Sequence, residues 1–189
     1  MVAEILQYIV DDIKIPDLEA SSLYAGIMID TNNFVNKTGV RTFEAAAFLR
    51  RCGADVTRVR KMFRDDVKSY RAKAEAIRHV ETYKTCFAIA VCPSEGIDSP
   101  TVVASQAANE LLNVDSIKAT FVLTDYQGKI FISARAIDEV NVQLIMEKMG
   151  GGGHINMAGA QLPGVTVEEA IRQLKATLDQ MMKEGDIEV

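Results

Sequence analysis

The chain has 189 residues, enough for one large domain or two small ones, and 48% of them are hydrophobic, which predicts a buried core. No apolar run is long enough to cross a bilayer, and Glu4, Asp11 and Asp12 exclude a signal peptide, so we expect a cytoplasmic location and no membrane contact from this chain. The net charge of −5 argues against the broad cationic face that long nucleic acids require.

The first third of the chain predicts helices. A helix over 2–10 begins at once without a capping turn, which suggests a chain that starts inside a larger domain. Asp17 is a plausible N-cap for a second helix that ends near residue 27. The apolar run that follows ends at Asp30, and further helices are expected over 42–51 and 55–65.

A longer helix over 66–83 has apolar residues at three- and four-residue spacing, and we place the domain boundary in it or at its end. After it, a compact apolar run predicts a buried strand over 85–91. Two further strands are expected over 119–125 and 129–134, joined by a hairpin turn at Tyr126-Gln127-Gly128. Helices are expected to start at Ser99-Pro100, after Asp138, and at Thr166 with its capping-box partner three residues on.

This order predicts an α/β fold in three parts. Residues 1–65 form a mostly helical portion, residues 66–83 a connecting helix, and residues 84–189 a small α/β domain with a mixed sheet.

Four consecutive glycines, Gly150 to Gly153, precede His154 and form the strongest local feature. Successive backbone N–H groups in a glycine-rich turn bind phosphate, and His154 adds another donor. The alternative is a helix C-cap at Gly150 followed by a flexible loop, and the residues alone leave the two interpretations balanced. The run fits neither a Walker loop nor a dinucleotide fingerprint.

Ser133 and Arg135 are two residues apart in a predicted strand, so their side chains share one side. A hydroxyl beside a guanidinium suits phosphate, and both residues flank the same helix as the glycine run. An arginine at a strand end that is solvated or paired with a carboxylate is the alternative.

Asp30 follows an apolar run and precedes Thr31-Asn32-Asn33, a position that suits a hard cation such as Mn²⁺ or Mg²⁺ or, alternatively, an aspartate that caps a turn. Asn33, Arg41 and Thr42 could line the same cleft. Two histidines cannot complete a site of several imidazoles, and the three cysteines lack zinc-knuckle spacing, so we expect buried free thiols.

Three segments together resemble one family: GIMIDTNNF…TGVRTFEAAAFLR, SARAIDEVNVQLIMEKMGGGGH and NMAGAQLPGVTVEEA. They resemble DHH-family phosphoesterases with a DHH-associated domain, and NVQLIMEKMGGGGH is most similar to GdpP-type cyclic-di-AMP phosphodiesterases. The resemblance implies a two-Mn²⁺ enzyme in which a metal-bound hydroxide opens cyclic di-AMP to linear pApA.

The resemblance also implies roles for individual residues. Asp30 would be a metal ligand, and the substrate would be held by Ser133, Arg135, Gly152, Gly153 and His154. The family's earlier metal motifs, the Asp-His-His among them, are absent, so we expect a chain that begins partway through the DHH domain and is inactive alone. The surface left by the missing strands predicts self-association as a homodimer, and family members place membrane modules upstream of the cytoplasmic catalytic part.

Two other functions stay open. An oligoribonuclease or pAp phosphatase of the same family would act on short oligonucleotides, and a non-catalytic nucleotide- or RNA-binding module would use the same pocket without turnover. Salt dependence separates a cyclic-dinucleotide pocket from a polyanion binder, because only the latter weakens steeply with salt.

Overall fold

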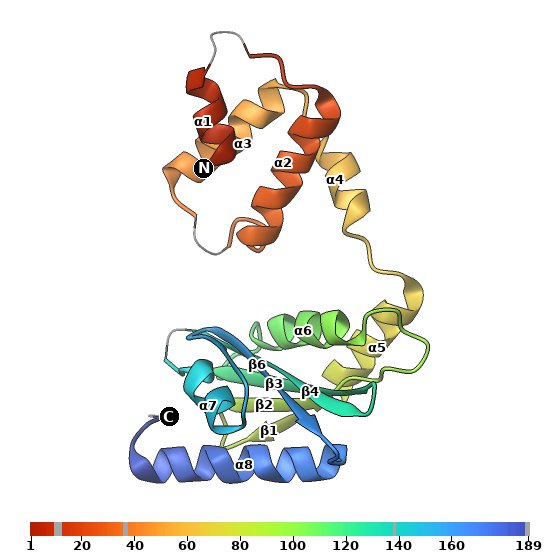
Figure 1. Ribbon diagram of the computed structural model, residues 1–189, viewed down its shortest axis with the longest axis vertical. Coiled ribbons are helices and arrows are strands. Elements are labelled where there is room, and N and C mark those ends of the chain that lie inside the picture. The colour runs from red at the N-terminus through yellow and green to blue at the C-terminus, as the bar shows by residue number, and fades with distance from the viewer. Residues whose placement is uncertain (10–12, 36–37, 138, 188–189) are drawn as a thin grey trace. The chain divides into compact units, whose positions relative to one another are not determined.

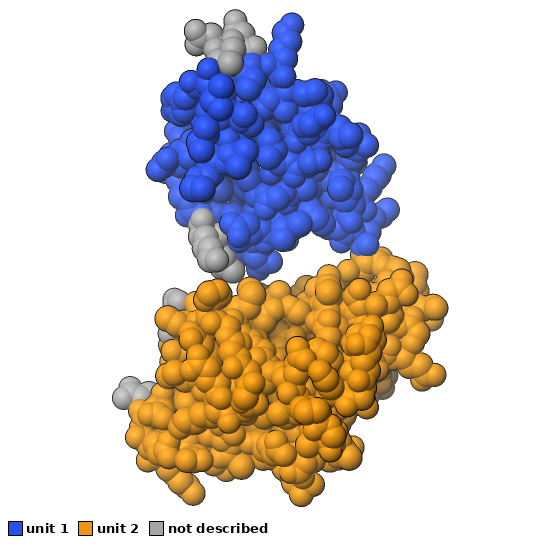
Figure 2. Space-filling model, viewed as in Figure 1, with its two compact units in different colours: residues 1–64 blue, residues 65–189 orange. Residues whose placement is uncertain are grey.

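The computed structural model describes residues 1–9, 13–35, 38–137 and 139–187. The chain divides into two compact units, residues 1–64 and 65–189, which Figure 2 colours separately. Within the described residues, no helix has the length and apolarity needed to cross a membrane.

The first unit is helical. Its elements are α1 (Val2–Ile9), α2 (Asp17–Asp30), α3 (Val40–Arg51) and α4 (Val56–Met62). Helix α2 begins at Asp17 with Pro16 as its N-cap and continues to Asp30, three residues beyond the predicted end, while Asp55 caps α4 by accepting from two backbone N–H groups.

The core of this unit is small and rich in alanine. Its central cluster contains one large side chain, Leu49, which packs with Ala3, Ala20, Ala45 and Ala54. Several large apolar side chains elsewhere in the unit face solvent; Tyr8, for example, is 85% exposed. Such exposed apolar area favours association with another surface, and the homodimer stays a prediction.

The second unit is a sandwich of helices around one sheet (Figure 1). Its elements are α5 (Val67–Arg78), β1 (Glu81–Tyr83), β2 (Phe87–Val91), α6 (Pro100–Leu111), β3 (Ala119–Tyr126), β4 (Lys129–Ala136), α7 (Val142–Lys148), β5 (Gly152–His154), β6 (Met157–Pro163) and α8 (Val167–Glu184). The strand order is β1-β2-β3-β4-β6-β5, with β2 and β3 parallel and the other neighbours antiparallel. The predicted α/β class and mixed sheet are confirmed.

Two apolar clusters pack helices against the two faces of the sheet. Phe121 and Leu123 face α7 and α8, whereas Val122 between them faces α5 and α6, as the alternation of side chains along a strand requires. The β3–β4 hairpin closes through Gln127-Gly128, both with positive φ, as a two-residue type I′ turn needs.

Several predicted boundaries were wrong. The helix expected over 66–83 ends at Arg78, and residues 81–83 instead form edge strand β1 paired with β2. The glycine run is not a loop throughout, since residues 152–154 form strand β5. Helix α7 has Asn141 as its N-cap, and the predicted cap Asp138 lies outside the described residues.

Candidate functional site

The candidate site is a cleft of about 540 Å³ in the second unit, beside the β5 edge of the sheet. Its lining comes from helix α6, strands β4 and β6, and the glycine run. These residues are Thr101, Phe131, Ile132, Ser133, Gly150, Gly151, Gly152, Gly159, Ala160 and Gln161.

The strand register arranges the predicted residues in two neighbouring rows. Paired residues of antiparallel strands point to the same face, so one row is Ser133, Gly159 and Gly152. The next row is Arg135, Met157 and His154. Both rows belong to the α6 face, because Ser133 also pairs with Val122, which packs under α6.

The structure requires glycine at some positions of the run and not at others. A Cβ on Gly151 would lie 2.1 Å from the carbonyl oxygen of Gly159, and one on Gly153 would lie 2.5 Å from that of Met157. These two positions therefore let β5 approach β6. Gly152, between them, has no atom within 4 Å of its Cβ position and no positive φ.

Packing thus gives no reason for a glycine at residue 152. Its Cβ position points into open space on the face shared with Ser133, and the residue lines the cleft. A glycine without a structural requirement is typical of a backbone that approaches a ligand closely.

Arg135 lies deeper than predicted. It is only 8% exposed, and its guanidinium is directed at α6 rather than being part of the cleft lining. Its Nε donates to Asn109 Oδ1 at 3.0 Å, one Nη to the Ala134 carbonyl at 2.8 Å, and the other Nη to Ser105 Oγ. Burial lowers the pKa of Arg135, although a guanidinium remains charged in proteins.

Within the described residues, no carboxylate forms an ion pair with Arg135. All three acceptors are neutral. The alternative of a solvated or salt-bridged arginine is therefore wrong. An unneutralised buried cation raises the electrostatic potential around it and favours an anion nearby.

Asp30 belongs to the first unit, as the last residue of α2, and its side chain is exposed. Asn32, Asn33 and Phe34 follow with positive φ, a strained turn that stacks Phe34 on Phe43 at 5.5 Å. Arg41 pairs with Glu4, and Thr42 Oγ1 accepts from the Gly39 backbone N–H, so both have partners of their own.

The residues described do not fit a two-metal centre. Across the described ranges, no three His, Cys, Asp or Glu side chains gather closely enough to hold a metal ion. The cysteines are free thiols as predicted, with Cys86 and Cys92 buried and Cys52 half-buried. Burial raises the pKa of Cys92 to about 11, so this thiol stays protonated.

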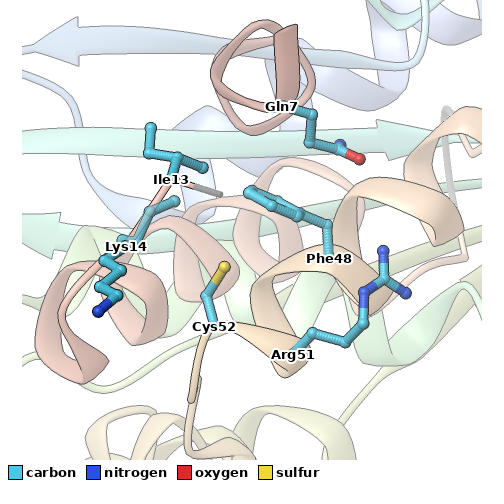
Figure 3. Close-up of a pocket in the computed structure, with 7 residues that line it drawn as sticks. Gln7, Ile13, Lys14, Phe48, Arg51 and Cys52 are labelled. Carbon is cyan, nitrogen blue, oxygen red and sulfur yellow. The ribbon is translucent and has the colours of Figure 1, made fainter. Parts of the chain in front are cut away.

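The first unit has a separate cleft of about 530 Å³ (Figure 3). Gln7 reaches it from α1, Phe48, Arg51 and Cys52 from α3, and Ile13 and Lys14 from the segment before α2. None of the predicted site residues lines it.

Comparison with known proteins identifies the family. The model of the DHHA1 domain matches residues 84–184. The chain belongs to the DHHA1 domain family. The matched residues include the cleft lining, Arg135 and β5, so the candidate site lies in the DHHA1 domain.

Two relatives that match nearly the whole chain are named cyclic-di-AMP phosphodiesterases. It is 39% identical to the cyclic-di-AMP phosphodiesterase PdeA of Listeria monocytogenes over 97% of its length, and 41% identical to the cyclic-di-AMP phosphodiesterase GdpP of Bacillus subtilis over 98%. The chain spans 28% of the length of each of these relatives.

A solved structure shares the fold. An exopolyphosphatase-related protein from Bacteroides fragilis superposes with a TM-score of 0.78 at 21% identity, covering 88% of this chain and 51% of that one.

Sequence reasoning missed part of the site. Gly159 lies opposite both Ser133 and Gly152, and a Cβ there would meet the Ile132 carbonyl oxygen at 2.9 Å. Thr101, Ser105 and Asn109 were missed as well, although their four-residue spacing along one face of α6 is a visible signal.

Proposed function

We propose that this chain supplies the substrate-recognition part of a metal-dependent phosphodiesterase that hydrolyses cyclic di-AMP to linear pApA. The proposal rests on one observation, the cleft of the DHHA1 domain. In this cleft the Cβ position of Gly152 is unoccupied beside Ser133, and the neighbouring Arg135 is bonded to neutral acceptors. The names of the relatives that match nearly the whole chain at 39–41% identity support this substrate.

Each residue of the cleft has a part in binding a phosphodiester. The backbone at Gly152 contacts a phosphate oxygen because no side chain keeps it away, and Ser133 donates its hydroxyl from the same row. The buried Arg135 provides positive potential, and His154 at the β5 edge lies in the same row as Arg135 on the α6 face of the sheet. Gly153, the middle residue of β5, lets this strand pair closely with β6 because it has no side chain.

The metal is expected to be Mn²⁺, and the metal-binding residues must come largely from beyond this chain. Asp30 is the one metal ligand that the resemblance assigns here, and one carboxylate cannot hold two ions. When bound, the metals would supply the nucleophile and stabilise charge on the phosphate.

Purified chain with Mn²⁺ and cyclic di-AMP is therefore expected to form no pApA above the protein-free blank over hours, as measured by anion-exchange chromatography of the nucleotides. Mn²⁺-dependent turnover at rates of about 1 s⁻¹, within the ordinary range for enzymes, would contradict the assignment of this chain to recognition. Release of AMP from pApA would instead favour the oligoribonuclease alternative.

That alternative has one supporting observation. The chain is 30% identical over 151 residues to the bifunctional oligoribonuclease and PAP phosphatase NrnA of Mycoplasma genitalium, a match that covers 77% of this chain and 47% of that protein. The lower identity makes it the second candidate. In either case we expect a cytoplasmic site of action, with a cyclic dinucleotide or short oligonucleotide as the partner and no long nucleic acid.

A further inference from the structure

The hydrogen bonds of Arg135 fix how two polar side chains of helix α6, Ser105 and Asn109, are oriented. A guanidinium can only donate hydrogen bonds. Ser105 Oγ, which contacts one Nη, must therefore accept from it, and the hydroxyl proton of Ser105 must point elsewhere. In the described part of the chain, that hydroxyl donates to no protein group.

The amide of Asn109 is oriented by the same requirement that the guanidinium can only donate. Its Oδ1 accepts from the Arg135 Nε at 3.0 Å, since the opposite orientation would set an amide N–H against a charged N–H. Both hydrogens of the Asn109 amide nitrogen consequently point away from Arg135. Among the described residues they meet no acceptor.

These side chains lie on the same face of α6 as Thr101, a residue of the cleft lining. Thr101 lines the cleft, and Ser105 and Asn109 follow at four-residue intervals, so the three lie along one face of the helix over about 12 Å. All three are half-buried. Together with Arg135 they form a row of hydrogen-bond donors that carries one unneutralised positive charge.

We propose that Ser105 and Asn109 bind a phosphate group of the ligand, with Arg135 as the positioning residue that turns their donors outward. This inference rests on the proposed function for the identity of the ligand and adds two binding residues to it. The neutrality of the acceptors is essential, because a carboxylate in place of Asn109 would cancel the charge that attracts the phosphate.

The substitution Asn109→Asp separates a binding role from a structural one. It keeps an oxygen acceptor for the Arg135 Nε and adds an ion pair, so the melting temperature should equal or exceed that of the wild type. It also removes two donors and repels phosphate, so the affinity for cyclic di-AMP, measured by calorimetry, should fall at least about tenfold. Asn113→Asp makes the same change at an exposed position, and its affinity should stay within about twofold of the wild type.

Ser105 is tested with a pair of variants. Ser105→Ala removes the outward hydroxyl and should weaken cyclic di-AMP binding about fivefold or more, whereas Ser105→Thr keeps a hydroxyl and should restore most of the affinity. A titration with inorganic phosphate, followed through the amide NMR signals of Asn109, reports on the same site without the nucleotide.

The outcomes distinguish the two proposals. If the wild type, Asn109→Asp and Ser105→Ala all bind cyclic di-AMP equally well, the proposal that Ser105 and Asn109 bind phosphate is wrong, while the proposed function stands. If cyclic di-AMP fails to bind but phosphate shifts the Asn109 signals in the wild type and not in Asn109→Asp, the donor row stands and the ligand assignment is wrong. If neither ligand binds, both proposals are overturned.

Discussion

Gly153→Ala is expected to lower the free energy of unfolding of the second unit by about 2–4 kcal/mol, while Gly152→Ala changes it by less than about 0.5 kcal/mol. The two positions are neighbours and differ in their surroundings. At residue 153 the new Cβ would lie 2.5 Å from the backbone of both Met157 and Ala158, at a φ of +149° that other residues rarely adopt. At residue 152 the Cβ would meet open space.

Urea denaturation followed by circular dichroism measures both changes. The two variants also distinguish an effect on folding from an effect on binding. Gly152→Ala should keep the fold, but it places a methyl group where the ligand is proposed to contact the protein backbone. We expect this variant to lose at least about tenfold in affinity for cyclic di-AMP. Equal destabilisation by the two substitutions would mean that Gly152 is also a packing residue, and the argument for a ligand at that position would fail.

Arg135→Met is expected to abolish measurable binding of cyclic di-AMP while the domain still unfolds cooperatively. Methionine fills much of the buried volume and removes the desolvation cost of the guanidinium. It also leaves Ser105 and Asn109 without a donor, although both are half-buried and reach water. The net loss of stability should therefore be about 1–3 kcal/mol, measured by thermal denaturation.

Arg135→Lys serves as the matched control for charge. An ammonium group cannot reproduce the planar fork that contacts Ser105 and Asn109 together, so an intermediate affinity is expected. Wild-type affinity in Arg135→Met would show that the buried charge contributes only to folding, in contradiction to both proposals.

The sequence pattern predicted most of the second unit, because strand β2 is a compact apolar run, β3 and β4 flank a clear turn signal, and helices α6 and α8 have clear start signals. The short edge strands were missed for physical reasons. Glu81–Tyr83 continues the pattern of a charged helix and becomes a strand only by pairing with β2. Residues 152–154 have weak strand propensity, and the contact of Gly151 and Gly153 with β6 places them in the sheet.

The candidate site was predictable in part. Alternation along the strand placed Ser133 and Arg135 on one face, and the register confirms it. The depth of Arg135 and its neutral partners on α6 depend on tertiary packing, which a sequence pattern does not contain. For the same reason, the distinction between Gly152 and its two neighbours required the position of β6.

We propose that the DHHA1 domain of this chain is a preformed recognition site for cyclic di-AMP. The most direct test is a calorimetric titration of the purified chain with cyclic di-AMP in the absence of metal, repeated at two salt concentrations. We predict saturable binding that weakens only slightly with salt, because few phosphates are engaged. Absence of binding at about 1 mM ligand, the weak end of measurable affinity, would contradict the claim.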